Sequence, residues 1–262
     1  MVVPVEEVCS VVERVVDAAV VEGLPERLSP LNRENVQAKV RATDVLSNLA
    51  AKFGGLFVCC GNKLEIALGY ATLYGDVGGA IAPLGDLTKV EVYEMGRFLN
   101  ERVFGRQVIP AELFPDDLFR CAPRGIPPSA ELAEGQVDPM KFGYHDALLG
   151  AFTDFLKKTP ADVLHWYLEG VLGERLGVTT ALLERWGLDD PAEFVSDLEW
   201  FCQSFQTNVF KRVQAPPVVV TSKTAFGFDL REAQLPFWPS REFQRLKERV
   251  LALERYVPFR GR

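Results

Sequence analysis

A short segment near residue 60 carries residue types that could bind a nucleotide and its metal ion. Residues 60–65 read Cys-Gly-Asn-Lys-Leu-Glu, directly after the apolar run 56–60 and before a predicted helix. In open parallel sheets, ligands bind outside the carboxyl ends of strands, where helix N-termini direct N–H groups at anions. Glu65 could there bind Mg²⁺, which prefers carboxylate and phosphate oxygens. Asn62 and Glu65 equally fit a helix-capping box, so a structural interpretation stays open.

Three further features could contact a phosphate-bearing ligand, and each has a structural alternative. Residues 74–79, Tyr-Gly-Asp-Val-Gly-Gly, would let the backbone approach a ligand closely, although an ordinary turn has the same composition. Lys89, just inside a predicted helix, could meet phosphate as a point charge, although a solvated lysine is the default there. Lys211 and Arg212 end another predicted helix, where the helix dipole favours cations whatever their function.

Apolar periodicity and stop signals predict the elements that must position these residues. A buried parallel strand is predicted at 56–60, from its short uninterrupted apolar run, and an extended segment at 216–222. The stretch 105–143, rich in Pro and Gly, predicts an irregular loop. Helices are predicted at 5–22, 33–53, 62–70, 88–101, 144–158, 160–174, 179–187, 191–212 and 240–255.

This order of elements predicts one α/β domain over residues 1–262, with a doubly wound parallel sheet that is poor in strands. Residues 1–104 would hold the sheet and its flanking helices, 105–143 the loop, and 144–262 a helical C-terminal part. A single buried strand would leave backbone groups unpaired at roughly 1–3 kcal/mol each. We therefore expect either partner strands from another chain or a sheet of which some strands are missing.

Composition excludes several classes of protein. The net charge of −7 and the pI of 5.1 argue against a nucleic-acid-binding protein, because no general positive field is available. The five cysteines show no C-x-x-C spacing and their number is odd, which predicts neither a zinc site nor a disulfide framework and indicates a reducing cytoplasm. No apolar run reaches the roughly 18 residues of a membrane helix, and the N-terminus does not read as a signal peptide.

Taken in order, several blocks of sequence resemble the NAD synthetase family. They are 34–38 (Glu-Asn-Val-Gln-Ala), 60–65, 69–76 (Gly-Tyr-Ala-Thr-Leu-Tyr-Gly-Asp), 81–89 (Ile-Ala-Pro-Leu-Gly-Asp-Leu-Thr-Lys) and 127–132 (Pro-Pro-Ser-Ala-Glu-Leu). Residues 211–217 (Lys-Arg-Val-Gln-Ala-Pro-Pro) and 225–227 (Ala-Phe-Gly) resemble C-terminal motifs of the glutamine-dependent members. The resemblance covers roughly residues 30–235. Other adenylating enzymes, such as GMP or asparagine synthetases, fit the chemistry but not these motifs.

The resemblance implies an adenine-nucleotide-hydrolase-like (Rossmann-like) fold and a ligase activity. Members of the family use ATP to adenylate nicotinic acid adenine dinucleotide. Ammonia, taken from solution or from a glutaminase domain, then attacks the acyl-adenylate to form NAD. The resemblance also implies a homodimer. By position, ATP would contact Cys60, Lys89 and Ser129, and Mg²⁺ would contact Glu65. The dinucleotide would contact Asn35, Lys39 and Lys211.

The chain departs from the family pattern at several positions. Cys60 stands where the family usually has Thr, Leu64 where it has Ser, and Lys39 where it has Arg, whose planar bidentate contact Lys cannot reproduce. The Ser-Gly-Gly-x-Asp-Ser pyrophosphate loop and the glutaminase domain do not occur in this sequence. We therefore expect a truncated synthetase domain that needs these parts from elsewhere, such as a separate chain. The alternative is a non-catalytic remnant or scaffold that keeps the dimer-forming and dinucleotide-binding surfaces.

Overall fold

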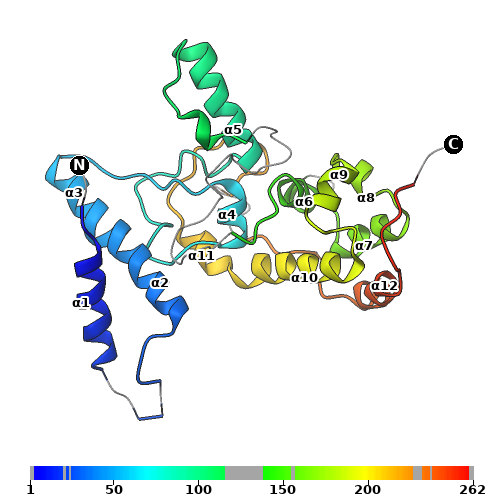
Figure 1. Ribbon diagram of the computed structural model, residues 1–262, viewed down its shortest axis with the longest axis horizontal. Helices are drawn as coiled ribbons and strands as arrows, with labels where there is room; N and C mark the ends of the chain where they lie inside the picture. The colour runs from blue at the N-terminus through cyan, green and yellow to red at the C-terminus, as the bar shows by residue number, and fades with distance from the viewer. Residues whose placement is uncertain are drawn as a thin grey trace.

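The computed structural model describes residues 3–19, 22–23, 25–115, 138–154, 157–226, 232–236 and 238–259. Figure 1 shows an N-terminal helical arm at one end, a central region around α4, and a cluster of helices at the other end. In chain order the helical elements are α1 (Glu6–Asp17), α2 (Pro30–Lys39), η1 (Val40–Leu46), α3 (Ser47–Lys52), α4 (Lys63–Leu68), α5 (Lys89–Phe98), η2 (Leu99–Val103), η3 (Ala111–Leu113), α6 (Tyr144–Thr153), α7 (Pro160–Leu168), α8 (Leu172–Leu176), α9 (Thr180–Arg185), α10 (Pro191–Thr207), α11 (Val209–Gln214) and α12 (Arg241–Leu251).

The N-terminal arm pairs α1 with the long helix formed by α2, η1 and α3. The Ser29 side chain accepts a hydrogen bond from Asn32 N at the start of α2, and Pro30 occupies the first helical turn. From there the chain stays helical through the π-helical stretch η1 to Lys52, which confirms the predicted helix at 33–53. A small apolar core of Cys9, Val36 and Val40 joins α1 to this helix.

The prediction of a buried strand at residues 56–60 is wrong. The segment is extended, and its Phe57 O and Cys59 N bond to Ala80 N and Ile81 O, both at 2.9 Å, but it is not a regular strand. Leu56 is 81% exposed and Val58 46% exposed, because only one edge of the segment is paired and its outer face meets solvent.

A second backbone contact continues this small array. Ala82 forms a parallel bridge with Val218, within the segment that was predicted to be extended. The close approach of the first two segments depends on Gly79, which has φ +138° and where a Cβ would lie 2.6 Å from Cys59 N. The described residues thus hold three short extended segments, with no regular strand, in place of the predicted sheet.

The C-terminal half is helical, as predicted, around a continuous apolar core. Its fully buried side chains include Tyr144, Phe194, Phe201 and Phe243. The predicted helix at 160–174 is interrupted at Gly170, which has φ +73°; the tail packs there, with Phe259 N donating to Gly170 O at 2.8 Å. Within the described ranges, no helix is long and apolar enough to cross a membrane.

Candidate functional site

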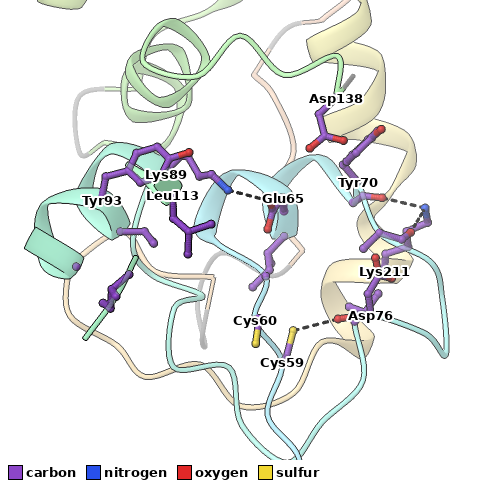
Figure 2. Close-up of a pocket in the computed structure, with 18 of the residues that line it drawn as sticks. Cys59, Cys60, Glu65, Tyr70, Asp76, Lys89, Tyr93, Leu113, Asp138 and Lys211 are labelled. Carbon is purple, nitrogen blue, oxygen red and sulfur yellow. Dashed lines mark hydrogen bonds and ion pairs between the residues drawn. The ribbon is translucent and has the colours of Figure 1, made fainter. Parts of the chain in front are cut away.

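A cavity of about 560 Å³ opens beside the N-terminus of α4. Its size lies in the range of small-molecule sites. Figure 2 shows its residues converging from α4, α5, α11 and the loops between them. Four of the residues predicted from sequence line it, namely Cys60, Glu65, Lys89 and Lys211. The other lining residues are Cys59, Gly61, Ile66, Gly69, Tyr70, Ala71, Asp76, Val77, Val92, Tyr93, Gly96, Ile109, Leu113, Phe114 and Asp138.

The structure leaves Glu65 able to fill both roles considered from sequence, that of a helix-capping residue and that of a metal ligand. Its Oε2 accepts a 2.8 Å bond from Asn62 N, and Asn62 Oδ1 accepts from Leu64 N and Glu65 N, which completes the capping box. The other oxygen, Oε1, lies 4.0 Å from Lys89 Nζ. Burial raises the pKa of Glu65, although the Lys89 ammonium works in the opposite direction. The cap therefore uses one oxygen and leaves the other facing the cavity.

Lys89 is aimed at Glu65 by its aromatic neighbours and by the start of α5. Its Nζ lies 5.7 Å from the centre of the Tyr93 ring and 5.1 Å from that of Phe142, distances at which a cation is attracted to a ring. The carboxylate of Asp146, on α6, accepts from Lys89 N at 3.5 Å and from Val90 N at 3.3 Å. Because that acid occupies the N-terminus of α5, an anion in the cavity would meet the Lys89 side chain and not the helix N–H groups.

Lys211 lies at the opposite side of the cavity from Lys89 (Figure 2). Its Nζ donates to Gly69 O at 2.9 Å and to Ala71 O at 2.7 Å, at the C-terminus of α4. Burial lowers the pKa of Lys211, and the nearby Asp76 carboxylate opposes that shift. Two of its three N–H groups thus hold the loop after α4, and the third remains for a ligand.

The neighbouring Arg212 explains how Lys211 reaches this place. Sequence reasoning assigned it only to a helix end, whereas its guanidinium is buried and donates to Ala67 O (2.6 Å), Phe205 O (2.7 Å) and Ala233 O (2.8 Å). Burial lowers the pKa of Arg212 to about 10. These bonds join α4, α10 and α11, so α11 presents Lys211 to the loop from a rigid base.

The two adjacent cysteines point to different environments, as expected for an extended segment. Cys59 is buried, and its Sγ lies 3.4 Å from Asp76 O. Burial raises the pKa of the Cys59 thiol. Cys60 is exposed at the edge of the cavity, where a thiol offers a ligand only a weak hydrogen bond.

One wall of the cavity is apolar and comes from α5 and the segment 109–114. Tyr93 and Phe114 pack edge to face with ring centres 6.5 Å apart. Phe114 approaches α5 at Gly96, where a Cβ would lie 2.7 Å from its ring. Together with Val92 and Leu113 these residues form a surface suited to a flat aromatic ring.

Asn35 and Lys39 do not line this cavity. They belong to a second one of about 420 Å³ between the N-terminal arm and Tyr74. The two cavities are joined by the loop after α4, because Asn35 Oδ1 accepts a 2.8 Å bond from Thr72 Oγ1 in that loop. Ser129, the third predicted ATP contact, lies outside the described residues.

Sequence reasoning missed two polar residues of the first cavity, Tyr70 and Asp138. Burial and the Asp138 carboxylate raise the pKa of Tyr70 to about 12. Tyr70 lies within a block already singled out, 69–76, so its proximity to the site could have been anticipated. Asp138 lies within the stretch 105–143 that was predicted to be an irregular loop, and no periodicity or motif spacing marks it.

The carboxylates near the cavity do not by themselves form a metal site. Among the described residues, no group of three or more His, Cys, Asp or Glu side chains is placed to hold a metal ion. A Mg²⁺ ion would fit here only in its usual manner with nucleotides, with one carboxylate such as Glu65 and the remaining ligands from phosphates and water.

Comparison with known proteins adds an independent observation. Residues 3–165 match the family model of NAD synthase. The chain is 36% identical over 197 residues to a glutamine-dependent NAD(+) synthetase of Synechocystis, covering 75% of the chain and 29% of that protein. It is 34% identical over 221 residues to one from Xanthomonas campestris, covering 80% of the chain and 33% of that protein. The chain thus spans about a third of the length of these curated relatives.

A solved structure shows the same fold. The crystal structure of a glutamine-dependent NAD(+) synthetase from Cytophaga hutchinsonii matches with a TM-score of 0.55 at 17% identity, covering 94% of this chain and 35% of that one. The chain therefore shares the fold of a NAD synthetase, but the described residues hold no regular strand, so the predicted parallel sheet is not confirmed. With the match of the family model over more than half of its length, the chain belongs to the NAD synthase family, a family of carbon–nitrogen ligases.

Proposed function

We propose that this chain is part of a synthetase domain that amidates nicotinic acid adenine dinucleotide to NAD at the expense of ATP. The observation that carries the proposal is the convergence of Cys60, Glu65, Lys89 and Lys211 on one cavity, although they come from separate segments. These are the positions at which the family resemblance implies ATP, metal and substrate contacts. The membership of the chain in the NAD synthase family supports the same reaction.

In the proposed reaction the side chains act by positioning and charge neutralisation. ATP would place its adenine against the apolar wall of α5 and its phosphates toward Lys89. The free oxygen of Glu65 would hold Mg²⁺, which would neutralise phosphate charge. The substrate carboxylate would attack the α-phosphorus of ATP, forming an acyl-adenylate and releasing pyrophosphate, and ammonia would then displace AMP to give the amide.

The decisive experiment places this chain in a complete enzyme. The matching third of the Synechocystis relative would be replaced by these 262 residues, and NAD formation from ATP, ammonia and the dinucleotide would be followed. We expect activity from the chimera, a large loss in its Lys89→Met variant, and no NAD from the chain alone, because its sequence holds no pyrophosphate loop. A folded but inactive chimera would contradict the proposal and favour the scaffold alternative.

We also propose that the chain pairs as a homodimer through its N-terminal arm. Apolar side chains lie exposed along α1, with Val11 47%, Val15 65% and Val16 44% exposed, and Leu31 on α2 is 64% exposed. Exposed apolar surface of this kind marks interaction sites. Light scattering should report twice the chain mass of 29.2 kDa, and a monomer at micromolar concentration would refute the pairing.

A cytoplasmic location is proposed on the state of the thiols. Cys9, Cys59, Cys60 and Cys202, the cysteines within the described ranges, are all free. Free thiols persist in reducing compartments. Cell fractionation with an antibody to the chain should find it in the cytoplasmic fraction, and recovery from an oxidising compartment would contradict the assignment.

A further inference from the structure

Asp138 is a cavity residue to which neither the motifs nor the proposed reaction gives a role. Figure 2 shows it beside Tyr70, on the side of Glu65 away from Leu113 and Tyr93. Its Oδ1 is buried and has no hydrogen-bond partner among the described residues. The Tyr70 hydroxyl hydrogen-bonds to this carboxylate but leaves Oδ1 without a donor. A buried acceptor without a donor is unfavourable, so a donor on a bound ligand would complete the carboxylate.

The surroundings of Asp138 restrict what that ligand group can be. The charge of Asp138 raises the pKa of Glu65, so a phosphate beside these two carboxylates would meet like charge, and Lys89, whose charge lowers the pKa of both, is the cation nearest to hand for it. An ionised carboxylate only accepts hydrogen bonds, so the group must be a hydroxyl or an amine. The apolar wall across the cavity suits an adenine ring, and adenine nucleotides carry such donors on both the ribose and the base.

We propose that Asp138 is a specificity-determining residue that accepts a hydrogen bond from a ribose hydroxyl or the amino group of an adenine nucleotide bound in this cavity. The proposal rests on the proposed function, because it takes the occupant to be a nucleotide of the synthetase reaction. It gives the nucleotide a direction, with sugar or base toward Asp138 and phosphates toward Lys89. Carboxylates recognise ribose hydroxyls in the same way in dinucleotide-binding sites.

The test is a binding measurement on the 262-residue chain by calorimetry. The variant Asp138→Asn keeps the shape but replaces one acceptor oxygen by an NH₂ donor, and Glu94→Gln, exposed on α5, is the charge-matched control. The probes are ATP, its 2′-deoxy and 3′-deoxy analogues, purine riboside triphosphate, which lacks the amino group, and nicotinic acid adenine dinucleotide. Asp138→Ser serves as a second variant if Asn unfolds the chain, as judged by circular dichroism.

We expect Asp138→Asn to weaken ATP about tenfold and Glu94→Gln to leave it unchanged. One analogue should bind the wild type about tenfold more weakly than ATP, and the variant should no longer distinguish that analogue from ATP, which identifies the donor. If only the dinucleotide is weakened, the donor belongs to that substrate. Equal affinities of variant and wild type for every probe overturn the role of Asp138 alone. If neither the wild-type chain nor the chimeric enzyme binds a nucleotide, the cavity is not the nucleotide site and the proposed function falls with this inference.

Discussion

Glu65→Gln separates the metal-binding role of Glu65 from its capping role. The Gln side chain keeps an oxygen that can accept the bond from Asn62 N, so the capping box survives. It removes the negative charge that lies 4.0 Å from Lys89 Nζ. Glu65→Ala is the matched variant, because it removes both the charge and the cap.

The expected change in stability follows from two opposing effects. At 4 Å the attraction of Lys89 for Glu65 is about 4 kcal/mol at an effective dielectric constant of 20. Burial nevertheless raises the pKa of Glu65, so desolvation of the carboxylate outweighs that attraction. Gln should therefore leave the free energy of unfolding within about 1 kcal/mol of wild type or increase it, whereas Ala should lower it by about 1 kcal/mol through the lost cap.

The pH dependence has a definite sign. The folded-state pKa of Glu65 lies above its ordinary value of 4.5, so between the two values the folded state binds more protons than the unfolded state. The stability of the wild type through this group consequently falls as pH rises through that window. The stability of Glu65→Gln relative to wild type should thus be greater at pH 7 than at pH 4, as measured by urea unfolding.

Magnesium with ATP provides the readout for ligand binding. A ligand at 100 times its Kd stabilises the folded state by about 2.7 kcal/mol. Wild type should show this increase in the presence of both Mg²⁺ and ATP, and Glu65→Gln should lose most of it. In the chimeric enzyme the same change should lower the rate about 100-fold. Unchanged stabilisation by MgATP together with an unchanged rate would refute the metal-binding role and leave Glu65 as a cap.

Three further changes test the framework of the site. Arg212→Lys should destabilise the chain by about 3 kcal/mol in urea unfolding, because Lys cannot reproduce the buried fork to three carbonyls; a cost below about 1 kcal/mol would contradict that anchoring role. Gly79→Ala should cost more than about 2 kcal/mol, because its Cβ would meet Cys59 N at 2.6 Å. Gly54→Ala, which also has positive φ but open space, is its control, and equal costs would argue against the close approach. Burial of Asp86 would raise its pKa, but hydrogen bonds from Thr221, Ser222 and Lys63 lower it. The stability that the Asp86 carboxylate contributes is therefore present above pH 3.8 and is lost as the pH falls. Asp86→Asn should therefore lower the free energy of unfolding by more at pH 7 than at pH 2, and an equal loss at both would count against this linkage.

Local signals in the sequence predicted most helices of the structure. The capping box of Asn62 and Glu65 and the N-cap Thr88 each begin a helix where expected, because their side-chain bonds involve residues only three positions away. Helix ends were less predictable. The break at Gly170 is a glycine cap that the predicted helix at 160–174 overlooked, with Gly170 N bonding to Tyr167 O and Val171 N to Trp166 O. Only the packing of the tail at Phe259 against this cap joins segments far apart in sequence.

The prediction of a buried strand at 56–60 failed for a related reason. An uninterrupted apolar run predicts burial only if neighbouring segments cover both faces, and Leu56 and Val58 are exposed here. The interpretation of Arg212 failed in the opposite sense. A cation at a helix end is normally solvated, whereas the Arg212 guanidinium is buried and donates to three carbonyls. Burial depends on what packs against a side chain, which its own neighbours in sequence do not specify.

By itself the sequence determined the family, the helical segments and four residues that meet at one cavity, because short motifs and periodicity are local properties. Only the tertiary structure decided that Asn35 and Lys39 line a different cavity, that one Glu65 oxygen faces Lys89 while the other caps α4, and that Asp138 joins the site. The physical reason is that a cavity is built from side chains of distant segments, and their distances are set by the packing of whole helices, not by spacing along the chain.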